Sequence, residues 1–311
     1  MSAADLHCLT SIRLGKADTA DALLRSDASG WNQVAEDWQL FIEFGNTFGF
    51  RDQAGRLIAT AAALPYVGGV GWISMVLVAE EHRHRGLASR LMEDCIKTLT
   101  DANITPVLDA TPAGEPVYVR LGFRGGFALD RWERDAVGNV QAEVACEAAG
   151  DASRNPHASA ARVAPRDPAF AEISNPVDAQ TLEDISNLDA TSTGIGRRFL
   201  IESFLSRGDS RAWVSPDRRA SVIIRAGHRA AQIGPLIANT DVRAIELLDA
   251  ALASTSSRIF LDVPAHRTGL TRHLQRCGFR KQRPYRRMAL GSSAILECPG
   301  HLYVLAGPEF G

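Results

Sequence analysis

Hydrophobic residues recur with two different spacings along the first part of the chain, and together they predict a helix followed by strands. Residues 38–45 carry apolar side chains at helical spacing. Residues 47–51 and 57–64 have the composition of strands, with a turn at 52–55 between them. The continuous apolar run 71–78 has the length of a strand that is covered on both faces.

A second group of elements follows this central strand. Leu87, Leu91, Cys95 and Leu99 share one face of a predicted helix. A short buried strand at 105–110 comes next, and then a helix that contains residues 117–121, stops at Gly122 and precedes a last strand. Because antiparallel strands precede the crossover, the order predicts an α/β fold with a mixed sheet flanked by helices, not a Rossmann unit.

The second half of the chain repeats this order more loosely. The stretch LDATPAGEPVYVRLGF, from Leu108, has a counterpart in LDVPAHRTGLTRHLQRCGF, from Leu261. A strand at 232–238 and a helix at 242–252 take the places of the central strand and its helix. Internal duplication is the simplest explanation, and it predicts two similar lobes.

A change of composition separates the two halves. Between Asp135 and Pro168 the chain turns to Ala, Pro, Asn, Asp and Ser and lacks large apolar residues at either spacing, with room for a strand or two near 140–144. We therefore expect an N-terminal domain over residues 1–145, a linker over 146–168 and a C-terminal domain over 169–311.

Composition narrows the class of protein. The 311 residues are 45% hydrophobic and 23% charged, with a formal net charge of −2, so the charge favours neither nucleic acid nor an anionic membrane. We find no signal peptide and no apolar run long enough to span a membrane, and we expect a cytoplasmic protein. The five cysteines are scattered, without a C-x-x-C pair, so we expect no disulfide framework and no metal site.

A loop between the apolar strand and the helix that begins at Leu87 carries the strongest chemical signal. It reads Ala79-Glu80-Glu81-His82-Arg83-His84-Arg85-Gly86. The first N–H groups of a helix have no partner within it, and the helix dipole adds positive potential there, so this arrangement can hold a phosphate. Gly86 lets the backbone approach closely, and the small Ala88 leaves room at the first turn.

Through these residues the chain resembles the GCN5-related N-acetyltransferase (GNAT) superfamily. The family signature, Arg/Gln-x-x-Gly-x-Gly/Ala behind a strand, matches Arg83-His84-Arg85-Gly86-Leu87-Ala88 behind Val76-Leu77-Val78, and Tyr118-Val119-Arg120-Leu121-Gly122-Phe123 is like the family's Tyr-x-x-x-Gly-Phe. The resemblance is most specific to a bacterial group of tandem-GNAT proteins of mostly unassigned substrate. It rests on stretches near residues 30–38, 72–78, 108–114, 233–236 and 305–308.

The resemblance implies acetyl-CoA as co-substrate. Backbone groups of Val76 and Val78 would pair with the pantetheine arm, and amides from His84 through Ser89 would hold the pyrophosphate. Arg83 and Arg85 either neutralise phosphate charge or face solvent. The implied cofactor-binding residues are Val76, Leu77, Val78, Arg83, His84, Arg85, Gly86, Leu87, Ala88 and Ser89.

Tyr118 matches the family's general acid, which protonates the departing CoA thiolate; the alternative is a core tyrosine. Asp109, at the end of a buried strand, is a candidate general base, and its alternative is to cap the following turn at 111–114. His82 and His84 are interpreted as exposed loop residues.

Other residues are candidates for contacts with the acceptor. Trp31, Asn32 and Asp37 are predicted to form a wall of the acceptor pocket, although residues 30–37 fit a helix start equally well. Four arginines are candidates for reading an acidic acceptor, with ordinary surface arginine as the default: Arg197, Arg198, Arg286 and Arg287.

The C-terminal copy departs from the family pattern. Its loop after residue 237 is shorter and lacks glycine, Asp241 stands where an anion would bind, and Leu274 replaces the tyrosine. We expect this lobe to bind no CoA and to shape the acceptor pocket.

The sequence thus favours a transferase that moves an acetyl group from acetyl-CoA to a primary amine of a small molecule by direct attack. The alternatives are a non-catalytic acyl-CoA sensor or scaffold and a protein or peptide N-acetyltransferase; nucleic-acid binding is disfavoured by the charge. The acceptor, the base, the acyl chain length and the choice between monomer and homodimer stay open.

Overall fold

A computed structural model describes residues 10–136, 170–173, 176–291 and 296–311. The expected domain boundary at 145, the linker 146–168 and the strands suggested near 140–144 lie outside the described residues and stay predictions. None of the described helices is both long and apolar enough to cross a membrane.

The N-terminal half contains the elements that the hydrophobic pattern predicts, together with helix α2, strand β1 and two short 3₁₀ helices that it does not predict. Helix α2 buries only Ala22 and Ser26, which explains its weak pattern. In chain order the elements are β1 (Ile12–Arg13), η1 (Lys16–Asp18), α2 (Thr19–Ala28), α3 (Ala35–Phe44), β2 (Asn46–Arg51), β3 (Leu57–Tyr66), β4 (Val70–Val78), η2 (Glu80–His82), α4 (Leu87–Asp101), β5 (Thr105–Ala110), α5 (Glu115–Arg120) and β6 (Arg124–Arg134).

The C-terminal half repeats this order. Its elements are β7 (Ala171–Glu172), α7 (Ala179–Thr193), α8 (Arg198–Ser206), β8 (Arg211–Val214), β9 (Ser221–Arg225), β10 (Ala231–Ile237), α9 (Asp241–Ala253), β11 (Ile259–Pro264), α10 (Thr268–Arg276), β12 (Arg280–Ala289) and β13 (Leu302–Val304). In each half a helix pair precedes antiparallel strands, a helix, a strand, a short helix and a last strand. The predicted repeat is therefore present, and the mixed α/β class is confirmed.

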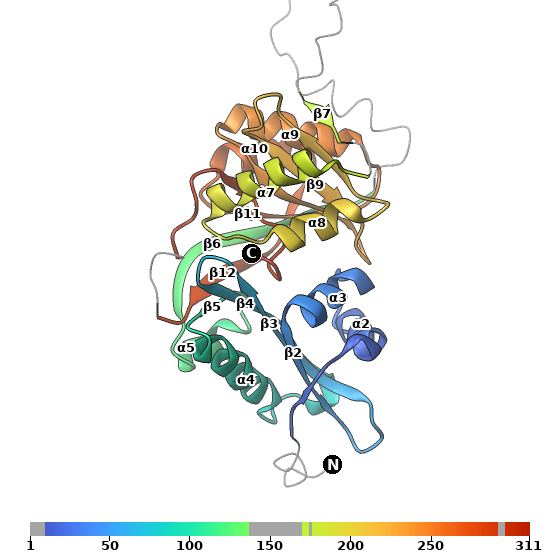
Figure 1. The fold of residues 1–311 in the computed structure, drawn as a ribbon, viewed down its shortest axis with the longest axis vertical. Coiled ribbons are helices and arrows are strands. Elements are labelled where there is room, and N and C mark those ends of the chain that lie inside the picture. Colours follow the sequence, from blue (N-terminus) through green and yellow to red (C-terminus); the bar gives the residue numbers. More distant parts are fainter. Residues whose placement is uncertain (1–9, 137–169, 174–175, 292–295) are drawn as a thin grey trace, which may run out of the picture.

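The last strand of each repeat crosses to the other half. The sheet runs β1-β2-β3-β4-β5-β12-β6-β11-β10-β9-β8-β7, with β13 paired to β10. Strand β12 of the C-terminal half lies against β5 of the N-terminal half, and β6 of the N-terminal half lies against β11. The two exchanged strands also pair with each other, across the middle of the molecule (Figure 1). The halves therefore share one sheet.

Two buried ion pairs connect the exchanged strands to their neighbours. Arg287 of β12 donates to both carboxylate oxygens of Asp109 in β5, at 2.7 and 3.0 Å. Arg131 of β6 donates to both oxygens of Asp262 in β11, at 2.8 Å each. Each aspartate follows the leucine of its Leu-Asp pair, and each arginine lies equally far along the chain after its Gly-Phe pair. Each half therefore contributes one arginine and one aspartate, and each arginine pairs with the aspartate of the other half.

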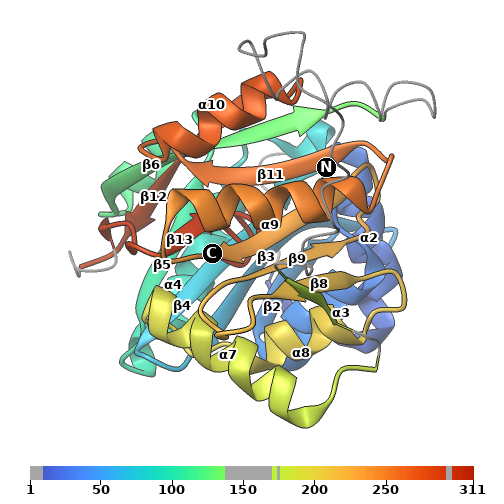
Figure 2. The same cartoon turned by 90° about the horizontal axis from the view of Figure 1, so that it is seen from above.

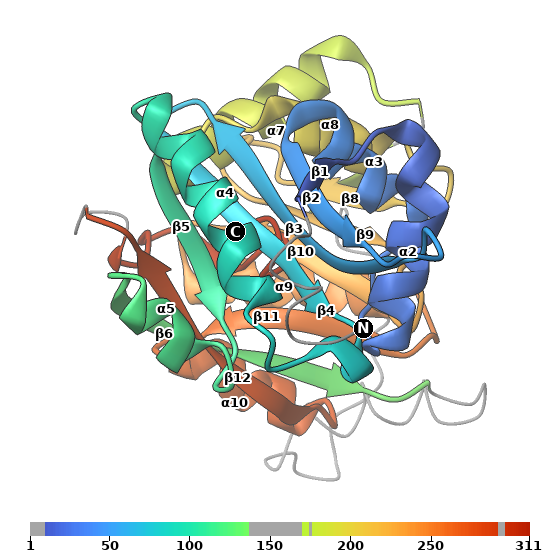
Figure 3. The same ribbon diagram turned by 90° about the horizontal axis from the view of Figure 1, so that it is seen from below.

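Helices cover both faces of the sheet. Helix α4 packs on β2, β3 and β4, while α2 and α3 pack on the opposite face of β3 (Figure 3). Helix α9 packs in the same way on β8, β9 and β10 (Figure 2). One apolar cluster contains Trp38 of α3, Phe204 of α8 and Phe310 near the end of the chain, so the two halves also share a core.

Two arginines that were expected at the surface are buried, so the default interpretation was wrong for both. Arg197 is 1% exposed; it holds both oxygens of Asp189 and donates to the Phe310 carbonyl at 2.9 Å. Arg287 is 3% exposed and forms a buried ion pair with Asp109. A guanidinium so enclosed cannot read a ligand. Arg198, in an exposed pair with Glu183, and Arg286 do lie at the surface.

The ion pair across β5 and β12 generates a stability prediction. We expect Asp109→Ala to lower the free energy of unfolding by about 3–5 kcal/mol, because it leaves the Arg287 charge buried without a partner. The double variant Asp109→Leu/Arg287→Met should recover most of that loss. Urea unfolding measures both.

The matched control is Arg198→Ala, which breaks an exposed pair and should cost less than about 1 kcal/mol. A loss for Asp109→Ala no larger than that of the control would contradict the structural role given to the pair.

Candidate functional site

Strands β4 and β5 diverge toward their C-terminal ends. They pair in parallel only where residues 70–72 face 105–107. A register shift in the pairing of β4 with β3, close to the left-handed residue Met75 (φ 54°), bends β4 away. Within the described residues no strand pairs with 74–78 on the β5 side. On the β5 side, the backbone groups of this stretch are thus left without a strand partner in the described chain, which leaves an opening between β4 and β5.

A groove continues from this opening. Its lining includes Val76, Leu77, Val78 and Arg83 on one side and residues 111–113 on the other. Arg83 Nε donates to the Val78 carbonyl at 3.3 Å, so this oxygen already has one partner in the chain. The structure therefore brings four of the predicted cofactor-binding residues together.

The loop after β4 leads to a helix start without a side-chain cap. Gly86 is the N-cap of α4 with φ 79°, and the first bond within the helix runs from the Arg90 N–H to the Gly86 carbonyl. The N–H groups of Leu87, Ala88 and Ser89 precede that bond and point out of the helix. His84 also has a positive φ, 61°, and residues 83–86 are exposed. Such a helix start attracts anions.

One prediction for this loop was wrong. His82 is 8% exposed and therefore buried, not an exposed loop residue. Its Nδ1 atom has no hydrogen-bond partner in the described part of the chain. The short helix η2 turns the side chain inward, which the sequence did not indicate.

The corresponding opening in the C-terminal half is filled. Strands β10 and β11 pair only where 231–233 face 259–261. Beyond this point Leu236 and Ile237 of β10 pair with β13, and the Leu305 N–H donates to the Asp262 carbonyl of β11 at 2.9 Å. Strand β13 therefore occupies the space that lies open in the N-terminal half.

The start of α9 also differs from that of α4. Thr240 caps it, with its side-chain oxygen accepting from the Arg243 N–H at 3.3 Å. The Tyr303 hydroxyl donates to Asp241 Oδ1 at 2.7 Å in the first turn. The helix end that could attract an anion is thus capped and acidic.

A cavity of about 90 Å³ lies beside the opening between β4 and β5. Both halves line it. The N-terminal half contributes Trp31, Asn32, Gln33, Ile73, Ser74, Met75, Val76, Leu108, Asp109, Thr111, Tyr118 and Arg131, and the C-terminal half contributes Arg283, Tyr285, Pro308 and Glu309. Its small volume admits a small molecule or the end of a chain.

Tyr118 reaches this cavity from α5. Its ring lies 6.1 Å from that of Phe123, and the backbone of Gly114 passes so close that an added Cβ would come within 2.8 Å of the ring. Burial raises the pKa of the phenol to about 12. The hydroxyl therefore keeps its proton at neutral pH, as a proton donor must.

Asp109 lines the cavity but is held by Arg287. Burial raises the pKa of the carboxyl group, and the guanidinium opposes that shift. The turn that follows is capped by Thr111, whose side-chain oxygen accepts from the Gly114 N–H at 3.3 Å, so capping by Asp109 is not observed. Both carboxylate oxygens are occupied, as they are in the equivalent Asp262.

The three predicted acceptor residues separate into two groups. Trp31 and Asn32 line the cavity, although the Asn32 side chain is also bonded to the β9–β10 loop, where its oxygen accepts from the Arg229 and Ala230 N–H groups at 2.8 and 3.0 Å. Asp37 does not line the cavity; it accepts from the Val34 N–H at the start of α3 and pairs with Arg207 at 2.9 Å. For Asp37 the alternative, a helix start, is what the structure shows.

Glu309 is a cavity residue that sequence analysis missed. It is 7% exposed, and burial raises the pKa of its carboxyl group to about 7. Trp72 Nε1 donates to the Pro308 carbonyl at 3.0 Å, and the Tyr66 hydroxyl donates to the Phe310 carbonyl at 2.9 Å, so the segment around Glu309 is fixed on the N-terminal half. In the sequence, the neighbouring stretch Leu-Ala-Gly-Pro at 305–308 contributed to the family resemblance, but nothing there marked Glu309 as a site residue.

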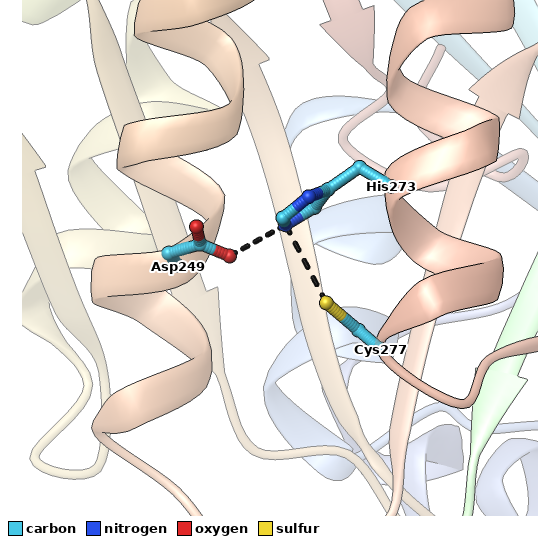
Figure 4. Close-up of side chains that lie close together, drawn as sticks. All are labelled: Asp249, His273 and Cys277. Atoms are coloured by element: carbon cyan, nitrogen blue, oxygen red, sulfur yellow. Dashed lines mark hydrogen bonds and ion pairs between the residues drawn. The ribbon is translucent and has the colours of Figure 1, made fainter. Parts of the chain in front are cut away.

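A second cluster of reactive side chains lies between α9 and α10 (Figure 4). Asp249 Oδ1 is 2.7 Å and Cys277 Sγ 3.4 Å from His273, and both contact the same nitrogen, Nε2. In a nucleophilic triad the acid and the nucleophile contact different ring nitrogens. The hydrogen bond with Asp249 raises the His273 pKa to about 9, and the pair connects the two helices. None of the three residues lines the cavity.

In a comparison with known proteins, each half of the chain matches a family model of GNAT acetyltransferases. A family model described as "Acetyltransferase (GNAT) family" matches residues 18–123, and one described as "Acetyltransferase (GNAT) domain" matches 185–304. An uncharacterised N-acetyltransferase of Bacillus subtilis (strain 168), YitH, is 23% identical over 96% of this chain and 98% of its own length.

Two solved structures have the same fold over nearly the whole chain. A putative acetyltransferase from Pyrococcus horikoshii has a TM-score of 0.74 at 17% identity and covers 97% of this chain and 96% of its own. A tandem GNAT protein from the clavulanic acid biosynthesis pathway has a TM-score of 0.58 at 15% identity, with 92% and 99% covered.

Proposed function

The chain belongs to the GCN5-related N-acetyltransferase superfamily as a protein of two tandem GNAT domains, and we propose that it moves an acetyl group from acetyl-CoA to a primary amine of a small molecule by direct attack. One observation carries the proposal. The opening between β4 and β5 leads on one side to the uncapped start of α4 and on the other to a cavity that contains Tyr118.

The N-terminal domain binds the cofactor in this proposal. The pantetheine arm enters the opening and pairs with the backbone of Val76 and Val78, as an additional strand would. The pyrophosphate lies at the N-H groups from His84 to Ser89, where the helix dipole and the neighbouring arginines favour negative charge. The thioester then ends at the cavity.

The C-terminal domain binds no cofactor in this proposal and completes the acceptor site. Strand β13 fills its opening, and Thr240 caps its helix. Its exchanged strand β12 and the segment after β13 instead supply Arg283, Tyr285 and Glu309 to the cavity of the N-terminal half. The proposal thus keeps the roles expected from the sequence, with cofactor binding in the N-terminal domain and a contribution to the acceptor pocket from the C-terminal domain.

Tyr118 acts as the general acid. Attack of a neutral amine on the thioester expels a CoA thiolate, and the phenol, protonated at neutral pH, supplies the proton. Asp109 is not retained as the base, because Arg287 occupies both of its oxygens and Asp262 makes the same contact in the half without a cofactor site.

The cavity also bears on the two alternatives. A sensor would need no proton donor beside the thioester. A protein acceptor would have to pass β12 and the segment 305–311, which close the cavity on the side of the C-terminal half. The first feature favours an enzyme over a sensor, and the second favours a small-molecule acceptor over a protein.

A pair of glycine variants tests the cofactor site. Gly86 and Gly55 both have φ 79° with open space where a Cβ would stand, so alanine brings similar backbone strain at each. Gly86→Ala should weaken acetyl-CoA binding about tenfold or more, equal to about 1.4 kcal/mol, because the loop that holds the pyrophosphate changes. Gly55→Ala should leave binding unchanged. Calorimetry measures both, and equal affinities would contradict the site.

A pair of tyrosine variants tests catalysis. We expect Tyr118→Phe to lower kcat on the order of 100-fold while the affinity for acetyl-CoA is kept, because only the proton donor is lost. Tyr303→Phe is the control: it removes a phenolic hydroxyl that donates to Asp241 in the C-terminal half, and it should keep full turnover. Steady-state release of CoA with an amine acceptor measures the rates. If Tyr118→Phe turned over like the wild type, the acid role would be excluded.

A further inference from the structure

Three polar atoms on the wall of the cavity have no hydrogen-bond partner within the described residues: Gln33 Oε1, Ser74 Oγ and Arg283 Nε. Gln33 and Ser74 are 4% and 8% exposed. Buried polar atoms are nearly always paired in folded proteins, because an unpaired one loses its hydrogen bonds to water without replacement. A polar ligand in the cavity would supply the missing partners.

Arg283 is the cation of the cavity that no carboxylate in the described chain neutralises. The other arginine on the wall, Arg131, is held by Asp262. Arg283 has its guanidinium carbon over the ring of Tyr285, 5.2 Å from the ring centre. It also lines the groove next to the opening between β4 and β5, so it lies where the acceptor and the thioester meet. A guanidinium in this state favours a carboxylate.

Glu309 is the corresponding anion. Its nearest cation is Arg225, at 3.7 Å, beyond hydrogen-bond distance, and Arg225 itself donates to the Gly234 and Ala306 carbonyls. The carboxylate is thus enclosed and fixed by its backbone, yet it keeps hydrogen-bonding capacity toward the cavity. An ammonium group would use that capacity.

We propose that the acceptor carries a carboxylate close to its amine, as an α-amino acid does, with Arg283 pairing with the carboxylate and Glu309 with the ammonium group. This inference rests on the proposed function and names its substrate class. It also makes Glu309 the general base that the sequence did not reveal.

The reaction balances with these two residues and Tyr118. Glu309 takes one proton from the ammonium group, and the freed nitrogen lone pair attacks the thioester carbon. The C–N bond forms, the C–S bond breaks, and Tyr118 protonates the leaving sulfur. The phenolate then takes the second proton from the nitrogen, and Glu309 releases its proton to water. The products are the N-acetyl amine and CoA, with one net proton released.

The environment of Glu309 predicts how the rate depends on pH. Burial raises its pKa to about 7; Arg131 of β6 and Arg225 of β9 lower it, and Asp37 of α3 and Asp262 of β11 raise it. The charged carboxylate is the base, so kcat/KM should fall as the pH drops below about 7. Glu309→Gln should abolish that dependence and lower kcat about 100-fold or more.

The test pairs amino acids with amines that lack the carboxylate, such as phenylalanine with phenethylamine and lysine with cadaverine, and measures CoA release by the full chain. We expect the amino acids to have about 10- to 100-fold higher kcat/KM, as loss of a charge-assisted contact implies. Arg283→Gln should remove this preference by raising KM for the amino acid. Arg286→Gln, on the same strand but exposed, is the matched control and should keep it.

Each result decides between the claims. Equal rates with amino acids and decarboxylated amines, or an Arg283→Gln defect in acetyl-CoA affinity instead of acceptor KM, would overturn the substrate class. Binding of acetyl-CoA without acetylation of any amino acid would overturn it as well, while the cofactor site would stand. Absence of acetyl-CoA binding would instead mean that the proposed function fails.

Discussion

The exchange of β6 and β12 between the two halves is the constraint on which the rest of this structure depends. An ion pair connects each exchanged strand to the other half. Arg287 of β12 pairs with Asp109, and Arg131 of β6 pairs with Asp262. Because β12 lies against β5, residues from the C-terminal half reach the cavity beside Tyr118. Neither half could form that cavity alone, so the duplication is part of the site.

The two halves share a fold but differ where a cofactor would bind. Both have a pair of parallel strands that diverge, and both have a helix that begins next to the divergence. In one half the space stays open and the helix start is uncapped; in the other, β13 fills the space and Thr240 caps the helix. In the proposed function, the half that binds no cofactor supplies β12 and the segment after β13, which carry Arg283 and Glu309.

Local patterns in the sequence predicted most elements of the N-terminal half and located the loop after β4, because periodicity and helix-start chemistry are local properties. The exchange of strands could not be predicted in this way, since β6 and β12 have the same pattern whichever neighbour they pair with. For the same reason Arg197 and Arg287 were expected at the surface. Their partners, Asp189 and Asp109, identify them only in three dimensions.

The candidate site was predicted in part. Val76, Leu77, Val78 and Arg83 line the groove, and Tyr118 lines the adjacent cavity. Trp31 lines both. The roles of these residues stay predictions. Asp109 looked like a free buried carboxylate because its partner lies far along the chain. Glu309 had no motif of its own, and its burial follows from contacts of its neighbours with Trp72 and Tyr66.

The central claim is that one half of this duplicated fold binds acetyl-CoA and the other contributes to the acceptor site. A calorimetric titration of the full chain with acetyl-CoA tests it most directly, through the number of sites. We expect one site per chain, because β13 blocks the second. Two sites per chain, or none, would contradict it.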